Sequence, residues 1–412
     1  MNTQVNDIIP QLKADLKGRL VMPDDDDYLQ VCEIWNAMVS RKPAMIVQCA
    51  DVDDVCCAVK FAQENSLEIA IRGGGHNIAG NAVCDDGIVI DFSNMTKVHV
   101  DADKKRAYVE PGARLGDFDK AVQAHGLATP VGINSTTGIA GLTLGGGFGW
   151  LTRKYGMTID NLVSVELVTL DGKKIRASND ENSDLFWATC GGGGNFGVVT
   201  QFEYKLHSVG PEIFAGLIVF PFAQAEQVLN QYRTFSETAP EELSVWVILR
   251  DAPPLPFLPE DIHGKRVIVL AVFYTGDAKE AQRLVEPLRG FGDRYGEHLG
   301  SQPYLDWQQA FDPLLAPGAR NYWKSHNLAE LSDGAISSIC EYAAILPSEQ
   351  CEIFIALVSG AANRVAEDSM AYSGRDAKFV MNVHARWDST DQDDSCISWA
   401  RGFFNSSKPS IV

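Results

Sequence analysis

The sequence has little positive charge. Lysine and arginine together number 35 against 54 aspartate and glutamate residues, which gives a formal net charge of -19 at pH 7. Proteins bind nucleic acid mainly by neutralising phosphates with Lys and Arg, and no basic run occurs in this chain. The composition therefore excludes a nucleic-acid partner and mainly predicts a soluble surface.

Long apolar runs are also missing. Residues 1–20 mix Asp, Lys and Asn among their apolar positions, so they lack the apolar core of a secretory signal. No later stretch approaches the length of a membrane span. We therefore expect a cytoplasmic protein that has no membrane partner.

Paired cysteines and sequence repeats are absent as well. The nine cysteines are scattered singly except for Cys56 and Cys57, and no CxxC pair or metal-type spacing occurs. We expect buried free thiols and no metal site. A chain of 412 residues without internal repeats or low-complexity tracts is best divided into two ordinary globular domains.

Glycine, in contrast, is clustered in two stretches. Gly73 to Gly75 follow an apolar segment and precede His76, and a second glycine-rich stretch lies between Thr129 and Trp150. Glycine backbone has no Cβ atoms and offers free N–H groups to a diphosphate at close range. The pattern predicts a nucleotide-type cofactor whose reactive part lies beside His76.

The elements around the first glycine stretch follow from spacing. Apolar residues at helical spacing predict a helix over 28–40. A short apolar run predicts a strand over 44–48, and a helix over 51–65 is expected to begin at Asp51 or Asp53.

A hairpin is predicted further along the chain. Asp171 and Gly172 form a strong turn pair and predict that 163–169 pairs with 174–177.

One stretch matches the glycine pattern of a dinucleotide-binding fingerprint but lacks the strand-to-helix order that the fingerprint requires. Gly192 to Gly197 read as GxGxxG, but they follow a predicted helix and precede a predicted strand, which is the reverse of the required order. We therefore reject a Rossmann dehydrogenase. Beyond Gly210 and Pro211, strands alternate with amphipathic helices and predict a second, α+β domain with mostly antiparallel strands.

Five motifs occur in order over about 130 residues: Arg72–Asn77, Gly132–Gly141, Gly145–Gly149 with Arg153–Gly156, Asp160 with Asn161, and Asn195–Val199. The chain thereby resembles the berberine bridge enzyme-like FAD-linked oxidases of the vanillyl-alcohol oxidase superfamily, and its pattern is most similar to their bacterial hydroxynicotine-oxidase-like members. The resemblance implies an α+β fold with a two-part PCMH-type FAD-binding domain at residues 1–208. A substrate domain with an antiparallel sheet would follow at 209–390, and 391–412 would begin a C-terminal return segment that the sequence leaves short.

The resemblance also assigns the cofactor site. It implies that His76 is joined to the 8α carbon of FAD, and a neutral imidazole is a competent nucleophile for such a bond. The alternative is that His76 only binds a phosphate or caps a turn. Many relatives attach FAD a second time through a cysteine, but Asn134 stands at the aligned position, so we expect a single link. The full set of expected FAD-binding residues is Arg72, Gly73, Gly74, Gly75, His76, Asn77, Asn134, Ser135, Thr136, Thr137, Gly138, Gly141, Gly145 and Val199.

Candidate catalytic residues come mainly from the predicted strand over 379–387. The resemblance places Asn382 on the substrate side, alternation adds His384, and Tyr155 is expected near the flavin without serving as a base. A second alternating set, Tyr322, Lys324 and His326, could face the flavin or form a solvated surface. The tyrosine that often serves as the family's base lies in a later segment that has no counterpart in this sequence.

The expected reaction is that of an FAD-dependent oxidoreductase. Such an oxidase transfers a hydride from a C–OH or C–N bond of a small organic substrate to FAD and then reduces molecular oxygen to hydrogen peroxide. Thr137 occupies the position where side-chain size is thought to control oxygen access. Two alternatives stay open: a dehydrogenase that uses another acceptor, and a flavin-loaded protein without turnover. A monomer and a homodimer are equally compatible with the sequence.

Overall fold

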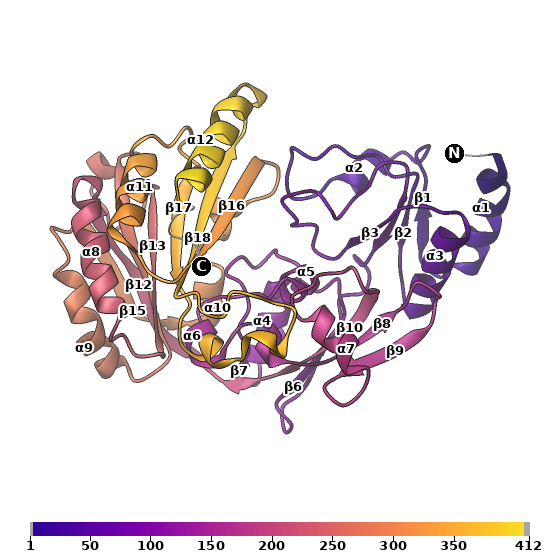
Figure 1. The fold of residues 1–412 in the computed structure, drawn as a ribbon, viewed down its shortest axis with the longest axis horizontal. Coiled ribbons are helices and arrows are strands. Elements are labelled where there is room, and N and C mark those ends of the chain that lie inside the picture. The colour runs from indigo at the N-terminus through magenta and orange to yellow at the C-terminus, as the bar shows by residue number, and fades with distance from the viewer. Residues whose placement is uncertain (1–2, 408–412) are drawn as a thin grey trace.

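The computed structural model describes residues 3–407, which form four β-sheets with helices packed against them. Figure 1 shows the N-terminal four-stranded sheet at one end of the molecule and a seven-stranded sheet at the other, with a five-stranded sheet between and below them. None of the helices within residues 3–407 is long and apolar enough to cross a membrane. All nine cysteines are free thiols, and none of them is exposed.

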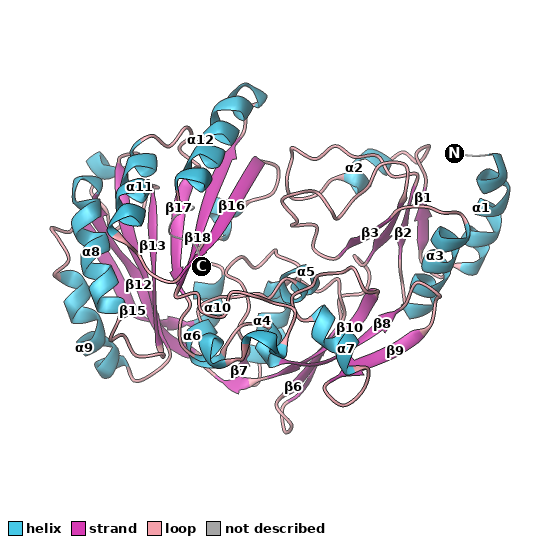
Figure 2. Cartoon of the chain, in the orientation of Figure 1, coloured by secondary structure: helices cyan, strands magenta, loops and turns pink. Residues whose placement is uncertain are grey.

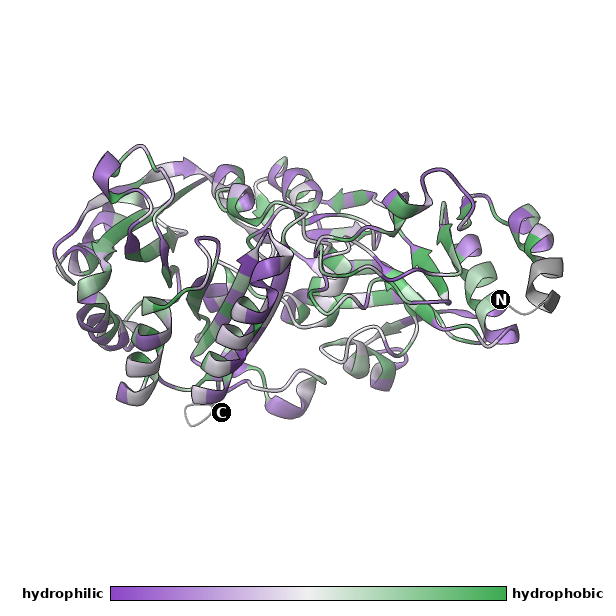
Figure 3. Cartoon of the chain, turned by 90° about the horizontal axis from the view of Figure 1, so that it is seen from above, coloured by the Kyte–Doolittle hydropathy of each residue, from purple (hydrophilic) through white to green (hydrophobic). Residues whose placement is uncertain are grey.

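The four-stranded sheet carries the first glycine stretch. Its strands β2 and β3 both pair in parallel with β4, and α3 connects β2 to β3. The Asp51 carboxylate caps α3 by accepting the backbone N–H groups of Asp53 and Asp54, which confirms the predicted helix start. Figure 3 shows the strands of this sheet as largely hydrophobic. The elements of this part are α1 (Thr3–Asp15), β1 (Arg19–Val21), α2 (Tyr28–Cys32), β2 (Met45–Gln48), α3 (Val52–Glu64), β3 (Ile69–Arg72) and β4 (Ile88–Asp91).

The helix predicted over 28–40 is wrong beyond its first turn and a half. Helix α2 ends at Cys32, and Glu33 is extended. The backbone N–H of Trp35 donates to the Gly75 carbonyl (3.1 Å), and its indole N–H donates to the Leu315 carbonyl (3.0 Å). The apolar spacing of this segment therefore reflects burial between the first glycine stretch and the second domain, not a helical face.

The five-stranded sheet contains the hairpin that the turn pair predicts. Strands β8 and β9 pair antiparallel, with Val168 opposite Lys174. The GxGxxG match lies in the connection from α7 to β10, which confirms that it is not a dinucleotide fingerprint. The elements are β5 (Val98–Asp101), β6 (Arg106–Val109), α4 (Leu115–Gln123), β7 (Leu127–Ala128), α5 (Ile139–Leu144), α6 (Thr152–Tyr155), β8 (Leu162–Val168), β9 (Lys174–Ser178), α7 (Ser183–Thr189), β10 (Val198–Lys205) and β11 (His207–Ser208).

The seven-stranded sheet is antiparallel throughout, in the order β15-β12-β14-β13-β17-β18-β16. Helices α8, α9, α11 and α12 cover its outer face, as Figure 2 shows. This architecture confirms the predicted α+β class; strand β15 and helix α11 were not anticipated. The elements are β12 (Glu212–Pro221), α8 (Ala225–Ser236), β13 (Leu243–Asp251), β14 (Arg266–Tyr274), α9 (Ala278–Arg289), β15 (Gly296–Pro303), α10 (Tyr304–Gln308), β16 (Arg320–Leu328), α11 (Asp333–Ala344), β17 (Glu352–Leu357), β18 (Phe379–Trp387) and α12 (Asp393–Ser406).

Short 3-10 helices lie in the connections between these helices and strands. They are η1 (Ile159–Asn161), η2 (Phe222–Gln224), η3 (Glu260–Ile262), η4 (Asp312–Leu315), η5 (Ala361–Arg364), η6 (Glu367–Ser369) and η7 (Thr390–Gln392). Helix α12 covers most of the expected return segment and packs against β16 and β18. The last residues of that segment, 408–412, lie outside the described residues.

An apolar core joins the two halves of the molecule. Trp150, from the second glycine-rich stretch, stacks on Trp246 of β13 with ring centroids 4.0 Å apart and lies 5.4 Å from the ring of Trp307 in α10. All three indoles are buried. Because aromatic rings dominate the burial of apolar area, this cluster fixes the seven-stranded sheet against the glycine-rich loops.

The register of β16 and β18 decides which side chains face those loops. Trp323 lies opposite His384 and Ser325 opposite Asn382, so these four share one face. The alternate set on β16 faces α12 instead: the His326 ring contacts the Phe404 ring at 4.0 Å. Tyr322, Lys324 and His326 therefore lie on the face that α12 packs against, where His326 is buried and Tyr322 and Lys324 stay half-exposed.

Candidate functional site

The backbones of the two glycine-rich loops approach most closely at Gly74 and Gly138. A Cβ atom added to Gly74 would lie 2.3 Å from the backbone nitrogen of Gly138, and one added to Gly138 would lie 2.3 Å from that of Gly74. No side chain fits between these backbones, so both positions require glycine. The contact brings His76, at the end of the first loop, beside Thr136 and Thr137 of the second.

The His76 imidazole is held on both nitrogens and on one face. Its Nε2 lies 3.0 Å from Thr136 Oγ1, its Nδ1 lies 3.4 Å from Thr137 Oγ1, and its ring stacks on Trp35 with centroids 5.1 Å apart. Burial, helped by the positive charge of Arg114, lowers the pKa of His76 to about 4. The imidazole is therefore neutral at pH 7 and keeps a lone pair for chemistry.

A cavity of about 820 Å³ opens in front of this loop. Its wall includes the backbone of Gly73–Gly75, the His76 ring, and the side chains of Trp35 and Arg114. This volume lies within the range of pockets that hold small ligands and cofactors, and glycine backbone together with the Arg114 guanidinium suits an anionic diphosphate. A nucleophilic imidazole on the same wall completes a set of groups that fits FAD.

A buried ion pair holds the base of the first loop. The Arg72 guanidinium donates to both carboxylate oxygens of Asp91, at 3.1 and 3.0 Å, and also to the Val31 carbonyl at 2.6 Å. Both charged side chains are almost completely buried. Arg72 thus connects β3, β4 and the segment before Trp35, and it also lines the cavity.

The second loop is tied in two directions. The Asn134 amide oxygen accepts the backbone N–H of Thr136 (3.0 Å) and its hydroxyl (2.6 Å). The Ser135 N–H donates to the Asp312 carboxylate of η4 at 2.9 Å, and the Ser135 hydroxyl also bonds that carboxylate. This loop therefore connects His76 to the second half of the molecule.

Several expected site residues lie outside the His76 cavity. Asn77 accepts the backbone N–H of Asn81 at 3.0 Å, and Val199 lies in the buried core around β10. The Tyr155 ring stacks on His207 at 3.9 Å, away from His76. Gly141 and Gly145 belong to the neighbourhood of α5, where a Cβ on Gly141 would meet nothing within 4 Å. The cofactor or catalytic roles of these residues stay predictions.

A second group of polar side chains lies around His384 on the seven-stranded sheet. Its Nδ1 lies 3.0 Å from Glu352 Oε1, while Arg250 Nη1 lies 2.8 Å from Glu352 Oε2. Burial raises the pKa of Glu352, but the Arg250 charge and the His384 bond outweigh it and hold the pKa below its usual range. Glu352 is therefore an ionised acceptor, and His384 donates its Nδ1 hydrogen to it. Asn382 lies two residues along the same strand face.

Two tryptophans connect the two histidines. The Trp35 ring contacts the His76 ring and meets the Trp323 ring edge-on at 5.4 Å, and Trp323 stacks on His384 at 3.9 Å. The Arg386 guanidinium lies 5.1 Å from the Trp35 ring. The sequence analysis did not identify Trp35, Arg114, Trp323 or Glu352 as site residues. Only Trp323 could have been found from the sequence, because it lies between Tyr322 and Lys324 on β16 and so points to the opposite face of the strand.

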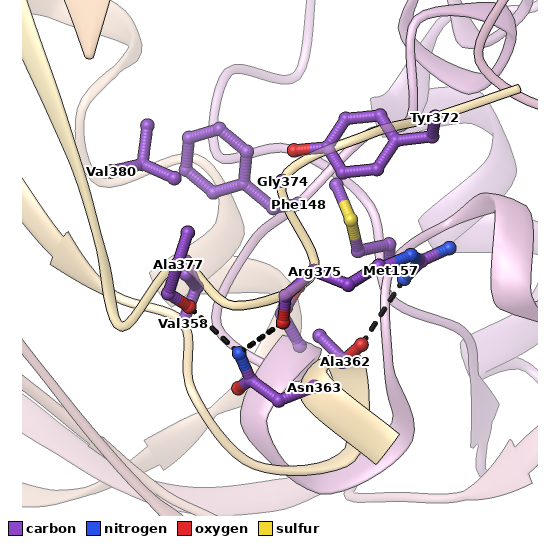
Figure 4. A pocket seen from close by; sticks show the side chains of 11 residues that line it. Phe148, Met157, Val358, Ala362, Asn363, Tyr372, Gly374, Arg375, Ala377 and Val380 are labelled. Carbon is purple, nitrogen blue, oxygen red and sulfur yellow. Dashed lines mark hydrogen bonds between the residues drawn. The ribbon is translucent and has the colours of Figure 1, made fainter. Parts of the chain in front are cut away.

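A second, much smaller cavity lies where the loop before β18 meets α6. Its volume is about 20 Å³, and it is lined by Phe148, Met157 and Tyr372 among others. Figure 4 shows Asn363 and Arg375 bonded to backbone carbonyls at its edge, and Arg375 also forms a buried ion pair with Asp160 (2.7 Å). Space of this size holds at most one water molecule, so it does not compete with the His76 cavity as a ligand site.

A sequence model of the FAD binding domain family matches residues 43–178, which include the first glycine loop, His76 and Thr136. The FAD-linked oxidoreductase YgaK of Bacillus subtilis is 33% identical over 398 residues, covering 95% of this chain and 85% of its own length. The chain belongs to the FAD-linked oxidoreductases. It is an FAD-dependent enzyme of that family.

Two further comparisons agree with this family. The (R)-6-hydroxynicotine oxidase of Paenarthrobacter nicotinovorans is 34% identical over 289 residues, covering 70% of this chain and 62% of its own length. The crystal structure of 6-hydroxy-D-nicotine oxidase from Arthrobacter nicotinovorans superposes with a TM-score of 0.82 at 26% identity, covering 96% of this chain and 86% of its own. The BBE-like 1 structure from Physcomitrella patens has a TM-score of 0.88 at 22% identity over 98% and 89% of the chains, which shows the shared fold.

Proposed function

We propose that this protein is an oxidase with FAD attached through a single bond to His76, acting on a C–OH or C–N bond of a small organic substrate with molecular oxygen as acceptor. The observation that carries the proposal is the arrangement of two histidines that are connected through the rings of Trp35 and Trp323. One is a neutral imidazole in a glycine-lined cavity, and the other is a carboxylate-bound imidazole on the facing sheet.

The first half of the molecule holds the cofactor. The backbone of Gly73–Gly75 and the Arg114 guanidinium suit the diphosphate, while His76, stacked on Trp35, anchors the isoalloxazine. The chemistry that bound FAD supplies is acceptance of a hydride and delivery of two electrons to oxygen, which gives hydrogen peroxide. The small Thr137 side chain beside His76 agrees with oxygen access, and no thiol stands at position 134 to form a second link.

His384 is the candidate base. Its Nδ1 hydrogen is committed to Glu352, so its Nε2 bears the lone pair, and Nε2 has no hydrogen-bond partner among the described residues. This arrangement lets Nε2 take the proton from a substrate hydroxyl or amine while the Glu352 carboxylate stabilises the imidazolium that forms. Asn382 offers an amide on the same strand face to orient the substrate group.

His384 is 7% exposed, so its environment favours proton transfer from a bound substrate over exchange with solvent. The name of the Paenarthrobacter relative indicates oxidation of a hydroxynicotine, and we propose a substrate of that general kind, a small organic amine or alcohol.

The test combines peroxide release with rapid-mixing measurement of flavin bleaching. A panel of small alcohols, amines and sugars is screened with the wild-type protein and with His384→Asn, Asn382→Ala and His99→Asn. His99 lies on the exposed face of β5 and serves as the matched control. We expect His384→Asn to slow flavin bleaching by at least about a hundredfold, the usual contribution of a general base. Unchanged bleaching would remove His384 from the mechanism, and bleaching that only a dye reverses would indicate a dehydrogenase.

A further inference from the structure

The Asn134 amide is oriented unambiguously by its neighbours. Its Oδ1 lies 3.0 Å from the backbone nitrogen of Thr136 and 2.6 Å from the Thr136 hydroxyl oxygen. A backbone N–H can only donate, so the amide atom that faces it must be the oxygen and not the NH2 group. The Thr136 hydroxyl then donates to the same oxygen.

The hydrogen bond from Thr136 to Asn134 determines which nitrogen of the His76 ring carries the hydrogen. A hydroxyl has one hydrogen, and the hydrogen of Thr136 is used on Asn134, so the Thr136 oxygen presents only a lone pair to the imidazole. His76 Nε2 lies 3.0 Å from this oxygen and must therefore carry the ring hydrogen. Because the imidazole is neutral, its other nitrogen, Nδ1, bears the lone pair, with the Thr137 hydroxyl 3.4 Å away.

We infer that Asn134 and Thr136 are positioning residues for FAD attachment, and that they select Nδ1 of His76 as the nitrogen that bonds to the flavin. The inference rests on the proposed covalent link and specifies how this chain makes it. The Asn134 side chain thus prepares His76 for the link to FAD.

The attachment step balances as follows. A C–N bond forms between His76 Nδ1 and the 8α carbon, while one C–H bond of the 8α methyl group and the Nε2–H bond of the imidazole break. The two electrons and two protons released reduce the isoalloxazine, and molecular oxygen then reoxidises it with formation of hydrogen peroxide. The Thr136 oxygen, which accepts the Nε2 hydrogen bond, stabilises the positive charge that the ring carries before Nε2 loses its proton.

The remaining contacts keep the ring in one orientation. Trp35 stacks on one face of His76 with the planes 22° apart, and Asn134 itself is 8% exposed. A ring flip would place Nδ1 beside the Thr136 oxygen, but it would break the hydrogen bond at Nε2 that the pair provides. Asn134 and Thr136 therefore determine which nitrogen of His76 bonds to the flavin, as well as how fast the bond forms.

The experiment measures attachment itself rather than turnover. The full chain is produced under riboflavin limitation and given FAD, and the flavin that stays with acid-precipitated protein is followed over time. The variants are Thr136→Val, Thr136→Ser and, as the matched control, Thr234→Val on the exposed side of α8. The bonded nitrogen is identified by long-range 1H–15N correlations from the 8α methylene protons in the flavin peptide of 15N-histidine-labelled protein.

We expect a link at Nδ1 in the wild-type protein. Thr136→Val should attach FAD at least about tenfold more slowly, the effect of losing one hydrogen bond, and should show some link at Nε2. Thr136→Ser and Thr234→Val should behave like the wild type. A wild-type link at Nε2, or an unchanged rate and nitrogen in Thr136→Val, would overturn the inference alone. Flavin that binds the wild type but is fully released by acid would instead overturn the proposed covalent function.

Discussion

Asp119 gives the sharpest prediction about stability. This carboxyl lies in α4, is 1% exposed, and accepts one hydrogen bond from Gln308 Nε2 of α10 at 2.9 Å. Within the described residues its second oxygen, Oδ1, and the Gln308 oxygen have no partner. Burial raises the pKa of Asp119 to about 7. An asparagine at position 119 would keep this buried side chain uncharged at every pH.

The sign of the pH dependence follows from linkage. The folded-state pKa lies above the unfolded value of about 3.9, so the native state binds more protons between about pH 4 and pH 7, and the unfolding free energy falls as pH rises through this window. A difference of about three pKa units corresponds to about 4 kcal/mol. We therefore expect Asp119→Asn to be more stable than the wild type at pH 8 by up to about 4 kcal/mol. The advantage should nearly vanish at pH 4.

Urea unfolding followed by tryptophan fluorescence at pH 5 and pH 8 provides the assay. Asp117→Asn, an exposed position on the same helix, is the matched control and should show no such difference. The buried Tyr304 nearby stays neutral over this range because burial, with the charge of Asp119, raises its pKa far above 10. An Asp119→Asn variant that is equally destabilised at both pH values would refute the reasoning.

Three further predictions concern the loops and the base. Gly74→Ala should abolish FAD retention, because the added Cβ would lie 2.3 Å from the Gly138 nitrogen. Retention is measured as flavin absorbance per protein. The control Gly300→Ala should retain flavin, because a Cβ at that position meets nothing within 4 Å. Arg375→Met should lower the unfolding free energy by about 3–5 kcal/mol in urea titrations, since it leaves Asp160 buried without its partner. Glu352→Gln should slow flavin reduction at least about tenfold, because the carboxylate that orients His384 and stabilises the imidazolium formed during proton transfer is lost. An unchanged rate of flavin reduction would contradict that role.

The parts of the fold that the sequence predicted are those that local signals determine. Asp51 caps α3, and the pair Asp171 and Gly172 turns the β8 and β9 hairpin, so both elements follow from short stretches. The segment 28–40 shows the limit of this approach. Its apolar residues repeat at helical spacing, but Trp35 is buried by contacts to Gly75 and Leu315, and the latter is 280 positions away.

The candidate site residues also fall into two groups, those that a local sequence pattern identifies and those that only the tertiary structure brings together. His76 and the glycines are recognisable because their chemistry depends on the residues beside them in the chain. The partners of His384 are not, since Glu352 and Trp323 reach it only through the register of three neighbouring strands. A polar, glycine-containing strand such as β15 also gives no local β signal, and it forms because β12 offers it a free edge.

The link between His76 and FAD is the central claim, and peptide mass spectrometry tests it most directly. Purified protein is precipitated with acid, digested with trypsin, and searched for flavin adducts, alongside His76→Ala. We predict that yellow colour stays with the wild-type pellet, that the peptide containing His76 carries the mass of one FAD, and that His76→Ala releases its flavin to the supernatant. Release of all flavin from the wild type, or an adduct on any cysteine, would contradict the account.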